Sequence, residues 1–75
     1  MEKKILVVDD ENPIRHLFQT ALRQKGYDVD SAESAEIALN LIEKNQYHLY
    51  LLDLNLPGMS GIDLCRIIKE MQPDA

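Results

Sequence analysis

Short apolar runs alternate with helix-like apolar stripes along this chain. Residues 5–8 are apolar at every position, which is typical of a strand covered on both faces. Residues 27–32 alternate apolar or small side chains with Asp28 and Asp30, as in an edge strand with one wet face, and residues 48–52 form a third run. A helical pattern follows each run, so the order βαβαβα predicts a parallel α/β sheet. Right-handed crossovers with a chain reversal then give strand order 2-1-3.

The first two helical stretches have recognisable ends. Asn12 and Pro13 fit the N-cap and the first helical residue of the first helix, and Gly26 lies where its C-terminal cap belongs. Ser34 fits the N-cap of the second helix, and Asn45 fits its end. These signals predict two short, separately capped helices.

Each helix also carries an apolar stripe that we expect to face the sheet. In chain order the stripes are Ile14, Leu17, Phe18, Ala21 and Leu22; then Ala35, Ala38, Leu39 and Ile42, widened by Ile37 and Leu41; then Leu64, Ile67, Ile68 and Met71, closed by Pro73. We expect Arg15 and Arg23 to face water, and Cys65 to fill the core from the inner side of the third helix.

The composition excludes several classes of function. A chain of 75 residues permits one small domain. Its formal net charge of -5 argues against direct binding to nucleic acid or to anionic lipid. The apolar run 5–8 is too short for a signal peptide or a membrane span, and the single cysteine, Cys65, excludes an internal disulfide. We therefore expect a cytoplasmic domain without membrane attachment.

Carboxylates follow the two strands that flank the expected switch point of the sheet, where ligands bind in open parallel sheets. Asp9 and Asp10 follow the first strand, and Asp53 follows the third. Taken singly, the acidic pair could serve as helix-dipole partners and Asp53 as a turn residue. Together in one crevice they repel one another, so bound protons or a cation must offset their charge. Mg²⁺ suits such a site, and a carboxylate beside it can attack a phosphoryl group to form an acyl phosphate.

Two stretches around these carboxylates resemble the signatures of response-regulator receiver domains. They are residues 7–11 (VVDDE) and 51–61 (LLDLNLPGMSG), and their order and separation fit that family. The resemblance covers the whole chain and implies a flavodoxin-like (CheY-like) α/β fold. It also implies two-component signal transduction by a phosphoacceptor module that catalyses only its own phosphorylation and dephosphorylation, and is not otherwise an enzyme.

The resemblance assigns roles to individual residues. It implies that Asp53 accepts a phosphoryl group from a sensor histidine kinase, and that Asp10 binds Mg²⁺ directly. It further implies that Asp9 helps to hold the ion, directly or through water, and that the main-chain carbonyl of Asn55 completes the protein ligands. Glu11 is expected to tune the site rather than to bind metal.

The family's domain has five β/α units, and residues 1–75 correspond to about the first three. The resemblance places a hydroxyl residue after the fourth strand and a lysine after the fifth, and both act on the phosphoryl group. Ser60 and Lys69 lie in the wrong elements for these roles. We therefore expect an incomplete N-terminal part of a receiver domain, with impaired activity of this chain by itself.

Without a fourth strand, residues 49–52 would form an edge that is apolar on both faces and free of proline. This predicts self-association through the third strand. The competing interpretation of the whole chain is thus a receiver-like interaction fragment that is not phosphorylated and that self-associates.

Two further classes fit the sequence less well. A phosphatase-like hydrolase would carry its nucleophile after the first strand, with a second acid two residues on, whereas Asn55 follows Asp53 at that spacing. A flavodoxin-like nucleotide binder would need small or hydroxyl residues after the first strand, where this chain has Asp9 and Asp10.

Overall fold

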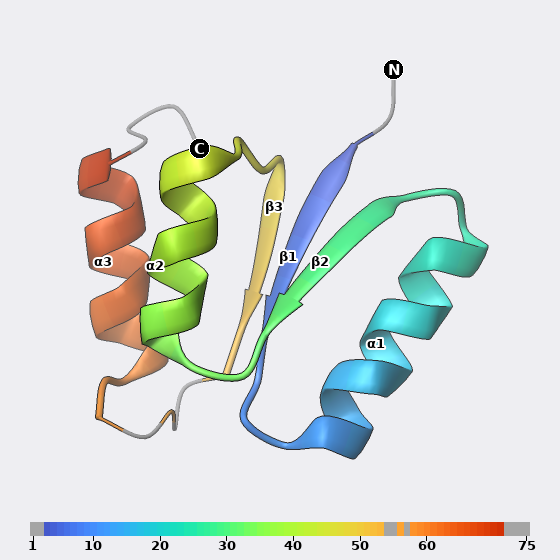
Figure 1. Cartoon of the computed structure of the whole chain (residues 1–75), viewed down its shortest axis with the longest axis horizontal. Helices are drawn as coiled ribbons and strands as arrows, with labels where there is room; N and C mark the ends of the chain where they lie inside the picture. The colour runs from blue at the N-terminus through green and yellow to red at the C-terminus, as the bar shows by residue number, and fades with distance from the viewer. Residues whose placement is uncertain (1–2, 54–55, 57, 72–75) are drawn as a thin grey trace.

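Strands and helices alternate strictly along the chain in the computed structural model, which describes residues 3–53, 56 and 58–71 (Figure 1). The elements are β1 (Lys4–Val8), α1 (Asn12–Gln24), β2 (Asp28–Ala32), α2 (Ala35–Lys44), β3 (Leu49–Leu52) and α3 (Gly61–Met71). The order βαβαβα expected from the hydrophobic pattern is confirmed. None of the described helices is long and apolar enough to cross a membrane.

The sheet is parallel and has the order β2-β1-β3, as the sequence predicts. The central strand, β1, pairs on one side from Lys4 to Val8 with β2, and on the other from Ile5 to Val8 with β3. Its four residues 5–8 are at most 2% exposed. Both faces of this strand are therefore covered, which accounts for its unbroken apolar run.

Helices lie on both sides of the sheet, with α2 and α3 on one side and α1 on the other (Figure 1). The larger buried cluster lies under α2 and α3: Leu6, Val8, Ala32, Ala35, Ala38, Ile42, Tyr47, Leu56, Leu64 and Ile68. The smaller one, on the α1 side, is made of Ile5, Val7 and Val29, with Leu22 and Leu51 packed against it. Alternate residues of β1 thus contribute to opposite layers of the core.

The apolar stripe expected on α1 is only partly correct. No residue of this helix is buried, and Ile14, Leu17 and Phe18 are 39%, 65% and 45% exposed. Only Leu22 of the stripe packs against the small cluster on this face. Within the described part of the chain, α1 is the one helix on its side of the sheet. Its apolar stripe is wider than the face of the sheet on which the helix packs, so part of the stripe stays exposed.

The ends of α1 differ slightly from the sequence-based expectation. Glu11 is the N-cap, and Asn12, expected as the cap, is the first helical residue. At the other end Gly26 has a φ of +93°, and the amides of Gly26 and Tyr27 donate to the carbonyls of Arg23 and Leu22. This is a Schellman motif, so the stop signal at Gly26 is confirmed.

The second helix follows its expected pattern closely. The Ser34 hydroxyl caps α2 by accepting a hydrogen bond from the Ile37 amide (3.2 Å), and the helix ends at Asn45. Ala35, Ala38 and Ile42 are buried, and Leu39 and Leu41 are partly buried against the same cluster. Ile37, by contrast, is 39% exposed and does not widen the buried stripe.

In α3 the buried stripe is narrower than expected. Leu64 and Ile68 are buried, Ile67 is half-buried, and Met71 is exposed. The expectation that Cys65 fills the core is wrong, because its side chain is exposed. Cys65 lies about 100° around the helix axis from Leu64, so it is outside the buried stripe formed by Leu64 and Ile68. The helix stop expected at Pro73 lies outside the described residues.

A polar cluster stabilises the amino-terminal end of the sheet. Tyr47 is 2% exposed, and its hydroxyl donates to Asp30 Oδ2 at 2.7 Å. Lys4 Nζ donates to Asn45 Oδ1 at 2.8 Å, lies 3.6 Å from Asp30 Oδ2, and lies 5.4 Å from the centre of the Tyr47 ring. His48, expected to open the third strand, precedes β3. Its main-chain amide donates a hydrogen bond to the Lys4 carbonyl, and its Nδ1 accepts one from the Lys4 amide.

Burial and the hydrogen bond to Asp30 raise the pKa of Tyr47 well above its ordinary value. In the unfolded chain the Tyr47 phenol ionises at about pH 10, whereas in the folded chain it stays neutral at that pH. The contribution of Tyr47 to the free energy of unfolding is therefore complete below this pH and is lost progressively above it. We expect Tyr47→Phe to lower the free energy of unfolding by about 1 kcal/mol at neutral pH. Above about pH 10 the wild-type chain should lose stability more steeply than the variant.

Urea denaturation across this pH range measures both effects. Tyr27→Phe is the matched control, because Tyr27 is 38% exposed and its loss should change neither quantity appreciably. Parallel pH profiles for wild type and Tyr47→Phe would contradict the expected linkage.

Candidate functional site

Main-chain hydrogen bonds carry the sheet one residue beyond the carboxyl ends of its strands. The Asp9 amide donates to the Ala32 carbonyl at 3.1 Å, and the Asp53 amide donates to the Val8 carbonyl at 2.9 Å. Val8 is paired with Leu52, so Asp9 and Asp53 follow paired residues of neighbouring strands. The backbone pairing of the sheet therefore places these two aspartates at the same edge.

Three carboxylates converge at this edge. Asp9, Asp10 and Asp53 each offer a carboxylate oxygen, and these oxygens all lie within 4.8 Å of one another. Asp9 and Asp53 are half-buried, whereas Asp10 is exposed. The crowding expected from the sequence is therefore present, and the site remains open to solvent. Asn55, whose carbonyl the resemblance adds to the ligand set, lies outside the described residues.

The donor set suits a small, hard cation. Mg²⁺ prefers oxygen ligands at about 2.1 Å, so two ligands of one ion lie about 3 Å apart when adjacent and about 4.2 Å apart when opposite. Carboxylate oxygens within 4.8 Å of one another lie close to these separations. The open side of the site leaves room for the waters that Mg²⁺ retains. The residues present therefore fit Mg²⁺.

The loop that carries the acidic pair is held by several short hydrogen bonds. One oxygen of the Asp9 carboxylate, Oδ1, accepts from the Glu11 amide at 2.9 Å. The Asp9 main-chain carbonyl accepts from Arg15 Nη1 at 2.8 Å, and Arg15 Nη2 donates to Asn12 Oδ1. Glu11, expected to tune the site, is exposed and occupies the N-cap position of α1 without a side-chain capping hydrogen bond.

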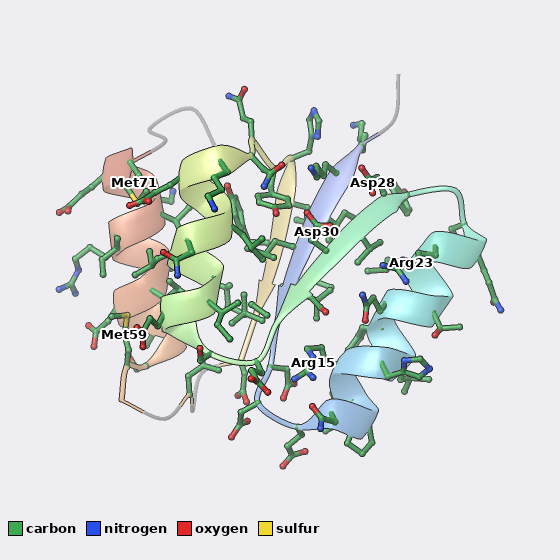
Figure 2. The ribbon with its side chains drawn as sticks, in the orientation of Figure 1. Arg15, Arg23, Asp28, Asp30, Met59 and Met71 are labelled. Atoms are coloured by element: carbon green, nitrogen blue, oxygen red, sulfur yellow. The ribbon has the colours of Figure 1, made fainter. Side chains whose placement is uncertain are left out.

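Arg15 is the residue of this site that the sequence analysis missed. The helical pattern assigned it to the solvent face of α1, yet it is half-buried and bonded to the acidic loop (Figure 2). The available signal was its position three residues after Asn12 in the first turn of the helix, close to the preceding strand.

Ser60 directly precedes α3, and Lys69 lies within it. The Ser60 hydroxyl accepts from the Asp63 amide at 3.1 Å at the start of α3. Lys69 lies along a groove between β3 and α3, together with Tyr50 and Cys65.

Known proteins resemble this chain in sequence and in architecture. The response regulator receiver domain family matches residues 5–75. The transcriptional regulatory protein ResD of Bacillus subtilis is 46% identical over 69 residues, which are 92% of this chain and 29% of ResD. This chain thus spans less than a third of that curated relative.

Solved structures agree with the sequence relationship. Response regulator TrrA of Thermotoga maritima, in complex with Mg²⁺ and BeF, superposes with a TM-score of 0.92 at 42% identity, covering 97% of this chain and 64% of that one. A complex of TrrA with the histidine kinase ThkA gives a TM-score of 0.91 at 42% identity, covering 97% and 63%. The sequence match, the strand order and these neighbours agree, and the chain belongs to the response regulator receiver domain family.

Proposed function

We propose that this chain is a cytoplasmic receiver module in which Asp53 accepts a phosphoryl group from a sensor histidine kinase. The observation that carries the proposal is the convergence of Asp9, Asp10 and Asp53 at the carboxyl edge of a parallel sheet. That TrrA has been solved with Mg²⁺ and BeF, and with a histidine kinase, supports the same role here. In this reading residues 1–75 are the N-terminal part of a larger receiver domain, and we infer no contact of this segment with nucleic acid or membrane.

Each acidic residue has a distinct task in the proposal. Asp10, the most exposed of the three, binds Mg²⁺ directly, and Asp9 holds it directly or through water. Asp53 and the main-chain carbonyl of Asn55 complete the protein ligands. When bound, Mg²⁺ neutralises charge on the oxygens of the transferring group.

The chemical step uses the Asp53 carboxylate as the nucleophile. One of its oxygens forms a bond to phosphorus while the bond from phosphorus to the kinase histidine nitrogen breaks, and the imidazole leaves with the electron pair. The product is an acyl phosphate on Asp53. Because the main-chain amide of Asp53 is bonded to Val8, the nucleophile is attached to the most deeply buried strand of the sheet.

Acetyl phosphate treatment tests the phosphoacceptor assignment. In the presence of Mg²⁺ we expect a mass increase of one phosphoryl group, which Asp53→Asn abolishes because an amide oxygen is a poor nucleophile. The reaction should be slow and the product short-lived in this chain by itself, because the family's stabilising hydroxyl and lysine are not matched in this sequence. Intact-protein mass spectrometry over a time course measures both.

Asp63→Asn is the matched control, since it removes an exposed carboxylate in the first turn of α3. It should be phosphorylated like the wild type. Labelling that persists in Asp53→Asn, or that does not require Mg²⁺, would refute the proposed site.

A second test concerns repulsion among the three carboxylates. Asp10→Asn removes one negative charge, so we expect its melting temperature without divalent ions to rise by roughly a few degrees. Saturating Mg²⁺ should stabilise the wild type more than this variant, because a ligand is missing. Thermal melts in EDTA and in Mg²⁺ give both values, and equal stabilisation of the two proteins by Mg²⁺ would exclude Asp10 as a ligand.

A second candidate function rests on the outer side of β3. In the described part of the chain this strand pairs with β1 alone, and Leu49 is 49% exposed. A groove of about 450 Å³ runs beside it, lined by Tyr50, Leu52, Gly61, Ile62, Cys65, Arg66 and Lys69. An apolar strand edge of this kind adds strands from other chains. The alternative is therefore an interaction fragment that self-associates through β3 and is not phosphorylated.

Sedimentation velocity distinguishes this alternative. If β3 mediates self-association, the chain should form dimers at high concentration, and Leu49→Lys should shift it toward monomer because edge charges oppose strand addition. Leu17→Lys is the control, because it places the same charge at an even more exposed leucine on α1 (65% exposed). A folded wild-type monomer at every concentration would eliminate the alternative.

A further inference from the structure

Arg15 joins helix α1 to the loop that carries the acidic pair. Its Nη1 donates to the main-chain carbonyl of Asp9 at 2.8 Å, and its Nη2 donates to the side chain of Asn12. Figure 2 shows the Arg15 side chain extending from α1 toward the end of β1. Both acceptors are neutral oxygens, so neither bond occupies a carboxylate oxygen. The contact is therefore a tether between two backbone segments rather than an ion pair.

The tether matters because it binds the peptide unit between Asp9 and Asp10. The carbonyl of Asp9 and the amide of Asp10 belong to one planar peptide. Fixing the Asp9 oxygen therefore restrains the peptide plane through which the backbone reaches Asp10, and so limits the directions that the Asp10 side chain can take. The Asp9 amide and its Oδ1 are already bonded, to Ala32 and to Glu11. Arg15 supplies the third restraint, on the peptide that leads to the exposed member of the cluster.

The packing of α1 makes such a restraint necessary. No residue of α1 is buried, so side-chain packing fixes the helix to the sheet only weakly. A second arginine at the far end of the helix makes a similar bond, from Arg23 Nη2 to the Val29 carbonyl at 2.9 Å (Figure 2). The two arginines thus tether opposite ends of α1 to main-chain carbonyls, and only Arg15 does so at the acidic cluster.

We propose that Arg15 is a positioning residue that holds the peptide between Asp9 and Asp10 in the orientation needed for Mg²⁺ binding. This inference rests on the proposed function, because it assumes that the acidic cluster binds the ion. Groups that orient a metal ligand without touching the metal typically change metal affinity about 10- to 100-fold when removed.

Two effects of Arg15 oppose each other, and their signs differ. A guanidinium near a cation site repels Mg²⁺, so losing the charge alone would strengthen binding. Losing the tether makes the loop more mobile. Mg²⁺ binding must then order the loop, and the entropic cost of that ordering lowers the affinity. Since the site is open to solvent, screening reduces the charge effect, and the tether dominates.

Calorimetric titration of this chain with Mg²⁺ tests the proposal through affinity and not through phosphorylation. Arg15→Met keeps the apolar stem and should weaken binding about tenfold. Arg15→Lys keeps the positive charge without the planar guanidinium, so its Mg²⁺ affinity should lie between those of the wild type and Arg15→Met. Arg23→Met is the matched control: it should lower thermal stability about as much as Arg15→Met and leave Mg²⁺ affinity unchanged.

The outcomes separate the inference from the function on which it rests. Unchanged or tighter binding by Arg15→Met, or equal weakening by Arg23→Met, overturns the role of Arg15 while the phosphoacceptor proposal stands. A wild-type chain that binds no Mg²⁺ overturns both. If circular dichroism shows that Arg15→Met does not fold, Asn12→Ala carries the test. It removes one of the two anchors of the guanidinium and should weaken binding by less than the roughly tenfold loss expected for Arg15→Met.

Discussion

The parallel pairing of β1 with both of its neighbours is the constraint on which the rest of this structure depends. The strand uses its main chain on two sides and its side chains on two faces, so it belongs to both layers of the core at once. The same hydrogen-bonding pattern continues past its end, from Asp9 to Ala32 and from Asp53 to Val8. The backbone pairing of the sheet thus extends to Asp9 and Asp53, where the acidic loop begins.

Most of this framework could be predicted from the sequence, because it is encoded in local patterns. The unbroken apolar run at residues 5–8 identifies a strand covered on both faces. The strand order follows from the alternation of elements and the hand of the crossovers, together with a chain reversal after the second strand. The approach of Asp53 to Asp9 and Asp10 needs only that order, because the ends of parallel strands meet at one edge.

Side-chain contacts between elements could not be predicted in this way. A helical pattern separates charged from apolar positions, but it does not show that the Arg15 guanidinium turns back onto the Asp9 carbonyl. It also marks the stripe of α1 as apolar without showing how much of that stripe the sheet can cover. The prediction of a buried Cys65 fails for a related reason, because an apolar neighbour in the sequence does not determine which way a side chain points.

The fact that β1 contributes to two layers of the core has a consequence for the length of the strand. Successive side chains of a strand point to opposite faces, so an insertion or deletion of one residue within these five would exchange the contents of the two layers. It would also displace the aspartate that follows by about 3.3 Å relative to the neighbouring strand. The length of this strand therefore matters to the acidic edge as well as to the core, and a change of one residue in that length would disturb both.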